Sequence, residues 1–326
     1  MKSRYTDSYE EYINTPSSSE NIAKFKRTIK SDYKTWSDFE IGMAKYAQTF
    51  TNESDFLECF RDYSLFLNDY LKREEERYFE KHENTPQKLY FAIVEQMKKS
   101  IYRFYEGTTN DLENKITQEI QKSKSINIFY INFNYTEIFD DMLRSTNAHF
   151  RIKNKCEGLH IHGTLSHDMV LGVDNELQIE KIPFDLSYKG KCAFLKTFFN
   201  SQFDSLRVTK SIEYIQKSDY ICIFGMQLGD SDLTWKKEIV NWLHNSPKHI
   251  LFYYDFEAMM QKDMLAFDRM CLSLDKKDVL KRRLGVNDIP DNQIQIPVGN
   301  EIFNLGYVSC TFTEGIITAN PPPFHY

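Results

Sequence analysis

Three apolar runs that each end in polar residues and glycines most constrain the fold of this chain. One run ends at Phe133 and leads into Asn134-Tyr135-Thr136, a second leads into His160-Ile161-His162-Gly163, and a third leads into the segment from Gly225 to Asp232. In an open parallel α/β sheet, ligands bind outside the carboxyl ends of the strands. The three runs therefore predict one shared site. Their Asn, Thr, His, Ser, Asp and Gly residues suit a sugar-phosphate ligand and a proton transfer.

The spacing of apolar residues changes near residue 124 and divides the chain into two regions. Residues 1–124 show helical spacing, so the sequence predicts a large N-terminal helical region. Residues 125–326 alternate apolar runs with helical patterns, which is typical of an α/β core with a mostly parallel sheet. The predicted strands cover residues 126–133, 168–173, 220–224, 249–254 and 307–312, and the predicted helices cover residues 137–145, 192–216, 232–244 and 256–284.

Three helices are predicted within the N-terminal region. One follows Trp36, and another extends from Phe56 through the charge run 72–77. Such a run of Lys, Arg and Glu is typical of a solvated helix face with ion pairs between successive turns. A third helix starts at Pro86, a residue suited to the first helical turn, and reaches Tyr102.

Composition excludes several classes of protein. The formal net charge of -6 argues against a dedicated nucleic-acid binder, which usually has a basic face. The six cysteines are scattered and form no C-x-x-C pair, so we expect a reducing compartment and no disulfide framework. The N-terminus lacks the apolar stretch of a signal peptide, and no apolar run approaches the roughly 18 residues that a membrane span needs. We therefore expect a soluble, cytoplasmic protein that does not enter a membrane.

The two histidines of the second motif allow more than one chemistry. Residues i and i+2 of a strand face the same side, so the imidazoles of His160 and His162 could point one way. A metal site would then need His167, Asp168 or Cys156 as a further ligand. The spacing matches no known metal motif, and the sequence predicts no metal site.

An acid–base role needs only one histidine at a strand end. Gly163 would allow a ligand to approach closely. We expect His160 to be a core residue and His162 to lie at the turn. One alternative is that Asn134 or Thr136 caps the helix that follows. The other is that Asn134 binds a ligand hydroxyl or an attacking water.

The third motif joins a predicted strand to a predicted helix. Asp230 or Ser231 is expected to cap that helix, whose free N–H groups could bind phosphate. Because the carboxylates of Asp230 and Asp232 would repel phosphate, the motif favours recognition of hydroxyl groups, as in ribose. Gly225, Gly229, Asp230, Ser231 and Asp232 are the candidate ligand-binding residues of this loop.

Taken in order, the motifs at residues 133–136, 160–164, 171–174 and 224–232 resemble those of the AbiH family of bacteriophage abortive-infection proteins, and the segment from Trp36 to Glu40 also fits. That family is similar to sirtuin-like proteins, whose sheet binds NAD. The resemblance implies a Rossmann-like, sirtuin-like core and a role in antiphage defence.

The resemblance also implies roles for individual residues. In sirtuin-like NAD hydrolases, a strand-end Asn and a His that precedes Gly form the active-site pair, and here they match Asn134 and His162. An Asp that contacts ribose often lies two residues after the Asn, but this chain has Thr136 there. This departure puts closely sirtuin-like chemistry in doubt.

A larger departure lies at the start of the sequence. Members of the family usually open with an apolar strand and a Gly-Asn-Gly-Phe-Asp loop, and the segment from Met1 to Asp7 resembles the part of the family that comes directly after that loop. The first strand and the Gly-rich loop are thus missing. We expect an in-frame upstream extension to encode them, because losing a central strand would expose strand edges.

Two functions remain open from the sequence. In the first, the protein hydrolyses NAD or a related nucleotide, with His162 as general base or ribose partner and Asn134 positioning water or ribose. Thr136 and Gly163 would contact the ligand. In the second, the protein is a non-catalytic nucleotide-binding sensor or scaffold that acts through a partner. A phage-derived trigger and a homo-oligomer fit either function.

Overall fold

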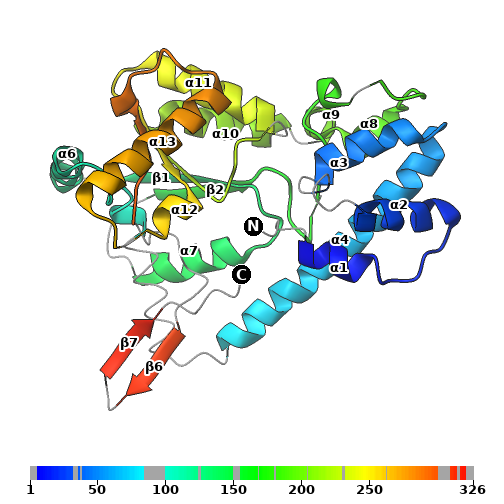
Figure 1. The fold of residues 1–326 in the computed structure, drawn as a ribbon, viewed down its shortest axis with the longest axis horizontal. Coiled ribbons are helices and arrows are strands. Elements are labelled where there is room, and N and C mark those ends of the chain that lie inside the picture. Colours follow the sequence, from blue (N-terminus) through cyan, green and yellow to red (C-terminus); the bar gives the residue numbers. More distant parts are fainter. Residues whose placement is uncertain are drawn as a thin grey trace.

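The computed structural model describes most of the chain (Figure 1). The described residues are 6–31, 36, 39–83, 100–123, 126–149, 155–167, 169–179, 181–203, 205–229, 232–261, 263–299, 309–313 and 316–320.

The N-terminal region is helical, as predicted. It contains α1 (Thr6–Tyr12), α2 (Glu20–Ser31), α3 (Phe39–Tyr46), the 3-10 helix η2 (Ala47–Thr49), α4 (Glu53–Glu83) and α6 (Asn110–Lys122). The helix predicted from Pro86 to Tyr102 falls mainly outside the described residues, although residues 100–102 are helical. None of the helices in the described part of the chain is both long and apolar enough to cross a lipid bilayer.

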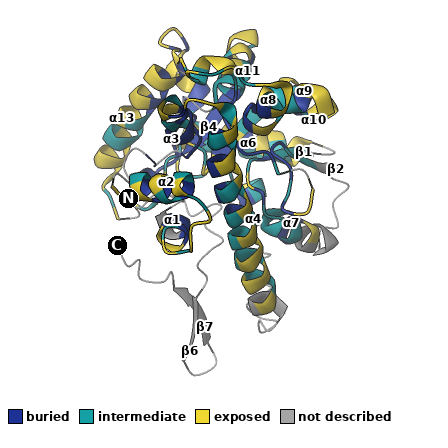
Figure 2. Cartoon of the chain, turned by 90° about the vertical axis from the view of Figure 1, so that its right-hand side faces the viewer, coloured by how far each residue is buried: buried dark blue, intermediate teal, exposed yellow. Residues whose placement is uncertain are grey.

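The long helix α4 buries only its first half. Apolar residues such as Phe56, Tyr63 and Leu67 recur along one face and are buried, as the helical period requires. Beyond Leu67, α4 carries only half-buried and exposed residues as far as residue 80 (Figure 2). The charge run therefore lies on a solvated helix, as predicted. Within the run, Glu74 pairs with Arg77 three residues later, and Arg73 pairs with Glu11 of α1.

The remainder of the chain alternates strands and helices. Its elements are β1 (Asn127–Asn132), α7 (Ile138–His149), β2 (Lys155–His160), η3 (Glu176–Gln178), α8 (Tyr188–Phe194), α9 (Lys196–Phe203), α10 (Ser205–Lys217), β3 (Tyr220–Phe224), α11 (Leu233–Asn245), β4 (Ile250–Tyr254), α12 (Phe256–Met259), α13 (Ala266–Leu284), η5 (Asp291–Gln293), β5 (Ile294–Gln295), β6 (Ser309–Thr313) and β7 (Ile316–Asn320).

The long strands form parallel sheets, which confirms the α/β class. Strands β1 and β2 pair in parallel, and so do β3, β4 and β5 in that order. The described strands do not form one continuous sheet, so the finer Rossmann-like arrangement stays a prediction. Strands β6 and β7 form an antiparallel hairpin that lies apart from the other elements in Figure 1.

One predicted strand is wrong. Residues 169–172 lie outside any strand, and Val173 makes only an isolated bridge with Leu195. The backbone of Gly172 has a φ of 143°, outside the region that strands occupy. The partner of β1 is instead β2, whose sequence Lys-Cys-Glu-Gly-Leu-His has little apolar periodicity.

Two predicted helices are broken. The helix expected over residues 192–216 is divided into α8, α9 and α10, and Leu195 is extended where it meets Val173. The helix expected over residues 256–284 is divided into α12 and α13. Periodicity cannot predict the first break, because the isolated bridge that extends Leu195 depends on a residue more than twenty positions away.

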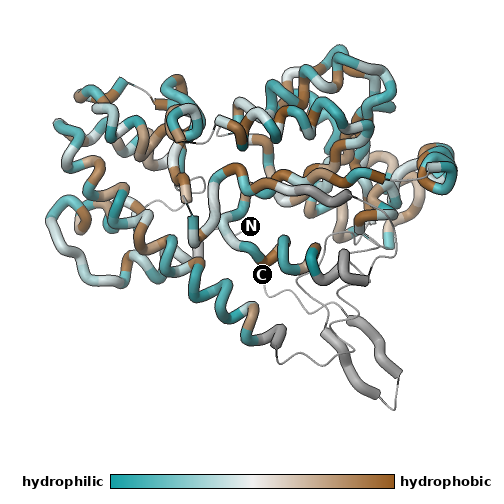
Figure 3. The backbone as a smooth tube through the Cα atoms, turned by 180° about the vertical axis from the view of Figure 1, so that it is seen from behind, coloured by the Kyte–Doolittle hydropathy of each residue, from teal (hydrophilic) through white to brown (hydrophobic). Residues whose placement is uncertain are grey.

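One hydrophobic core joins the N-terminal helices to α8. The ring of Phe194 meets Phe56 and Phe60 of α4 edge-to-face, with centroids 5.0 and 5.1 Å apart. In Figure 1, α8 and α9 accordingly lie on the same side of the molecule as α1 to α4, and Figure 3 shows apolar and polar residues alternating along these helices. This core includes residues from both sides of residue 124. The domain boundary that the sequence predicts near that residue stays a prediction.

A buried ion pair crosses the same region. Lys196 Nζ on α9 donates to Glu40 Oε2 on α3 at 2.6 Å, and the two side chains are only 6% and 9% exposed. The other carboxylate oxygen of Glu40 accepts the backbone N–H of Gly172 at 3.4 Å. Glu40 thus ties an N-terminal helix to both α9 and the segment that leads to η3.

We predict that Glu40→Gln lowers the free energy of unfolding by about 3 kcal/mol, because it leaves the Lys196 ammonium buried without its counter-charge. Urea denaturation measures this loss. The double variant Glu40→Gln/Lys196→Met should recover most of the lost stability. A double variant that is less stable than Glu40→Gln would contradict the prediction.

Candidate functional site

The carboxyl ends of β1 and β2 lie side by side. In the parallel register, Asn132 is the partner of His160, so the first and second sequence motifs leave the sheet at the same edge. The backbone N–H of Ile161 donates to Asn132 O at 3.0 Å and closes this edge. The structure therefore brings these two motifs together, as predicted.

His160 is held between two acceptors. Its Nε2 lies 2.7 Å from Asp140 Oδ2 on α7, and its Nδ1 lies 2.9 Å from the backbone oxygen of Asn134. Tyr130 donates its hydroxyl to the other Asp140 oxygen at 2.6 Å. A carboxylate and a carbonyl can only accept, so these two contacts favour a cationic ring with hydrogen on both nitrogens, although the Asn132 amide nitrogen also lies 3.4 Å from Nε2.

The pKa values of this pair agree with that charge state. Burial would lower the pKa of His160, but the hydrogen bond and the negative charge of Asp140 raise it above its usual value. Burial would raise the pKa of Asp140, but the hydrogen bonds from His160 and Tyr130 lower it. Both shifts favour the charged form of each partner.

His162 has the opposite character. Its side chain lies between the rings of Phe133 and Tyr135, with centroids at 5.5 and 6.4 Å, and the residue is 8% exposed. Its Nδ1 is buried and has no hydrogen-bond partner among the described residues. Burial, followed by the positive charges of Lys196 and Arg207, holds the pKa of His162 well below its usual value. The ring is therefore uncharged near neutral pH.

His160 is a partnered, mostly buried residue and His162 lies at the turn, as expected, but His162 is buried as well, so the expectation that it lies outside the core is wrong. Strand β2 ends at His160, so the alternation that would place both rings on one face does not reach His162. The chain turns at Ile161, which enters the core, and Gly163 adopts a φ of 75° that favours glycine.

The side chain of Asn134 is open to solvent. Asn134 is exposed, and its backbone N–H donates to Asn132 Oδ1 at 3.0 Å. No hydrogen bond joins the side chains of Asn134 and His162, although the two neighbours of Asn134 flank the His162 ring. Thr136 is half-buried at the start of the turn before α7. The predicted pair thus shares one end of the sheet without direct contact.

The third motif leads from β3 into α11. Gly225 and Leu228 adopt positive φ values of 69° and 52°, and the backbone N–H of Gly229 donates to Asp232 Oδ2 at 2.9 Å. Asp230 and Ser231 lie outside the described residues. The carboxylate of Asp232 therefore shapes this loop.

Asp174 was not among the site residues assigned from the sequence. Its Oδ2 accepts the backbone N–H of Thr234 in the first turn of α11 at 2.9 Å. A carboxylate at a helix N-terminus stabilises free N–H groups and the helix dipole. The contact joins residues 60 positions apart, so no local pattern predicts it. The motif from Leu171 to Asp174 was the only feature of the sequence that pointed to Asp174.

Two further buried polar atoms near the site have no partner in the described part of the chain. They are Asn200 Oδ1 on α9 and Ser211 Oγ on α10. Asn200 lies one turn after Lys196, and Ser211 one turn after Arg207, the two cations that act on His162. The inner faces of these helices thus carry cations and unpaired hydrogen-bonding atoms. Among the described residues, no group of three or more His, Cys, Asp or Glu could hold a metal ion.

The Asp140–His160 pair predicts how stability depends on pH. The lowered pKa of Asp140 adds stability above its unfolded value of about 3.9, and that stability is lost as the pH falls. The raised pKa of His160 adds stability below about 6.5, and that stability is lost as the pH rises through the folded value. We predict that Asp140→Asn is most destabilising between about pH 4 and 6.5.

Thermal unfolding of both proteins from pH 4 to 9 measures this dependence. Asp288→Asn is the matched control, since it breaks the exposed His244–Asp288 pair, and we expect no measurable change from it. A pH-independent difference for Asp140→Asn would show that the buried pair is not charged.

Comparison with known proteins identifies one family. No curated protein and no solved structure matches the chain. The family described as Bacteriophage abortive infection AbiH matches residues 1–254, which include the helical region and the ends of β1, β2 and β3. Membership implies a role in phage abortive infection. The chain belongs to the AbiH family of bacteriophage abortive-infection proteins.

Proposed function

We propose that the protein acts in abortive infection by binding NAD or a related nucleotide at the carboxyl ends of β1 and β2 and cleaving its N-glycosidic bond. One observation carries the proposal. His162 presents an uncharged imidazole with an unpartnered Nδ1, at the same end of the sheet as the exposed Asn134. A Rossmann-like, sirtuin-like core would provide this arrangement.

The chemistry requires a base and a held water. Water would attack the anomeric carbon of the ribose while the bond from that carbon to the nucleobase nitrogen breaks. His162 would accept the proton of that water and later release it to solvent, which only an uncharged ring can do. With a pyridinium leaving group, the electron pair of the broken bond neutralises the ring nitrogen.

Neighbouring residues would bind and orient the ligand. Asn134 would hold the ribose or the water, and His160 would be a positioning residue, because it donates to the backbone oxygen of Asn134 at 2.9 Å. Lys196 and Arg207 are the cations that act on His162; Lys196 is already paired with Glu40, so the attraction for the phosphates of a nucleotide would come from Arg207.

A second candidate function is nucleotide binding without turnover. The 8% exposure of His162 favours it, because a substrate reaches Nδ1 only if the segment around the ring moves. Asp174 and Asp232 also have their carboxylates engaged by backbone N–H groups. In this case the bound nucleotide would change how the protein binds a partner.

We predict that His162→Gln and Asn134→Ala each reduce NAD consumption during phage infection by about a hundredfold or more, because each removes a group that acts on the reacting water or ribose. Nucleotide levels in infected cells measure the effect. His244→Gln is the matched control, since His244 is an exposed histidine near the end of α11. Soluble yield and thermal stability show whether each variant folds.

The same experiment separates the two functions. Defence that persists in a folded His162→Gln protein would overturn the hydrolase. Defence with constant NAD levels, together with NAD binding by the purified protein, would establish the non-catalytic function instead.

A further inference from the structure

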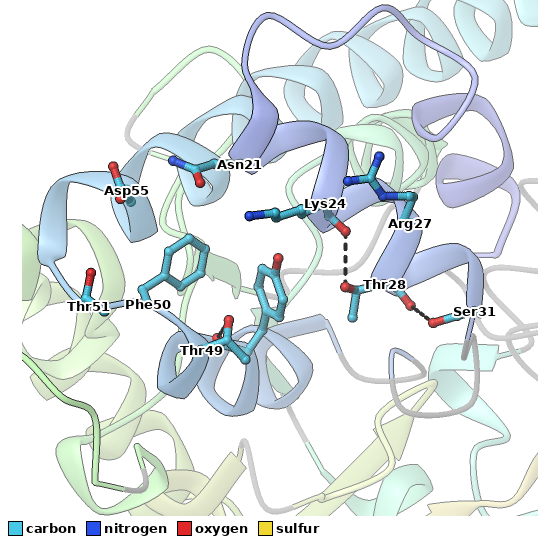
Figure 4. Close-up of a pocket in the computed structure, with 10 residues that line it drawn as sticks. Asn21, Lys24, Arg27, Thr28, Ser31, Thr49, Phe50, Thr51 and Asp55 are labelled. Carbon is cyan, nitrogen blue, oxygen red and sulfur yellow. Dashed lines mark hydrogen bonds between the residues drawn. The ribbon is translucent and has the colours of Figure 1, made fainter.

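A hollow lies in the helical region, away from the strand ends. It has a volume of about 590 Å³ and lies between α2 and the turn that joins η2 to α4 (Figure 4). Helix α2 places its apolar stripe of Ile22, Phe25 and Ile29 in the core. Its opposite, polar stripe lines the hollow.

Two cations on this stripe have no counter-charge. Lys24 and Arg27 are exposed, lie one turn apart, and make no ion pair with any residue that the structure describes. The one carboxylate in the lining, Asp55, already accepts a hydrogen bond from Asn52 Nδ2 at 2.9 Å. Unpaired cations that share a hollow attract an anion, even on a chain whose net charge is -6.

The hydroxyl groups of the lining are arranged as acceptors. Thr28 Oγ1 donates to the backbone oxygen of Lys24 at 3.1 Å, and Ser31 Oγ donates to Thr28 O at 2.9 Å, as the dashed lines in Figure 4 show. Thr49 Oγ1 donates to Tyr46 O at 2.8 Å. Because each hydroxyl hydrogen is already used, these oxygens can only accept further hydrogen bonds, and those of Thr28 and Thr49 also interact with the Tyr46 hydroxyl.

The lining therefore offers two kinds of group, which are the cations of α2 and the hydroxyl oxygens of Thr28 and Ser31 on α2 and of Thr49 across the hollow. Figure 4 shows Lys24 extending from α2 toward Phe50, with Arg27 one turn further along the same helix. The cations match a phosphate group, and the hydroxyl oxygens match sugar hydroxyls. An apolar ligand would leave these polar groups unpaired, and a nucleic acid would need more than two cations.

We propose that this hollow binds a sugar phosphate, either free or as part of a ribonucleotide, with the phosphate on Lys24 and Arg27 and the sugar hydroxyls on Thr28, Ser31 and Thr49. The site is separate from the one at the ends of β1 and β2 and does not rest on the proposed hydrolase. It gives the protein a place to sense a metabolite or nucleotide fragment.

Isothermal titration calorimetry of the full chain with ribose 5-phosphate tests the proposal. We expect saturable 1:1 binding that weakens about tenfold in Lys24→Gln and in Arg27→Gln, because each loses a charge-assisted hydrogen bond to phosphate. Lys30→Gln is the matched control, since Lys30 is exposed on the same helix outside the lining. Binding that is absent, or that weakens equally in all three variants, would overturn the site.

Further titrations identify which part of the ligand is recognised. Ribose alone and inorganic phosphate alone should each bind more weakly than ribose 5-phosphate. Thr49→Val should weaken ribose 5-phosphate and leave inorganic phosphate unchanged. Inorganic phosphate that binds as tightly as the sugar phosphate would overturn the assignment of the sugar hydroxyls to Thr28, Ser31 and Thr49. AMP shows whether an attached base is tolerated, and its exclusion would restrict the site to free sugar phosphates.

Discussion

The ion pair between Glu40 and Lys196 is the contact on which much of the remaining arrangement depends. It joins side chains 156 positions apart, in a region where water is excluded and an unpaired charge is costly. Glu40 also accepts the N–H of Gly172, where an added Cβ would lie only 2.3 Å from Phe194 O. Only glycine lets the chain pass so close to α8 and then bring Val173 to Leu195.

The close approach of Gly172 to α8 also affects the site at the ends of β1 and β2. After Val173 the chain reaches Asp174, which accepts the first-turn N–H of Thr234 and so fixes the start of α11. Lys196 contributes to the low pKa of His162, after burial itself. Two histidines two residues apart thus hold different charges: His160 is cationic beside Asp140, and His162 is neutral. One stabilises the strand end, while the other keeps a free nitrogen.

The sequence predicted those parts of the fold that rest on local pattern. The apolar pattern identified α4, α7, α11, β1, β3 and β4, because a helix repeats its apolar face every turn and a strand of a parallel sheet is a nearly continuous apolar run. It predicted that a strand ends at the motif 160–163 but not the bounds of β2, whose six residues include a lysine, a glutamate and a glycine, and it placed a strand at residues 168–173, where an isolated bridge exists. Pairing partners are set by contacts distant in the sequence, which a local pattern does not encode.

For the site, the sequence by itself determined which motifs lie at the strand ends, because an apolar run that stops at polar residues marks the end of a buried strand. The tertiary structure decided which histidine is charged, since that depends on Asp140 from α7 and on Lys196 from α9. It also decided that Asp174 caps α11 and that α2 faces a hollow with two unpaired cations. Charge state and unpaired polarity depend on three-dimensional neighbours, and no local run of residues specifies them.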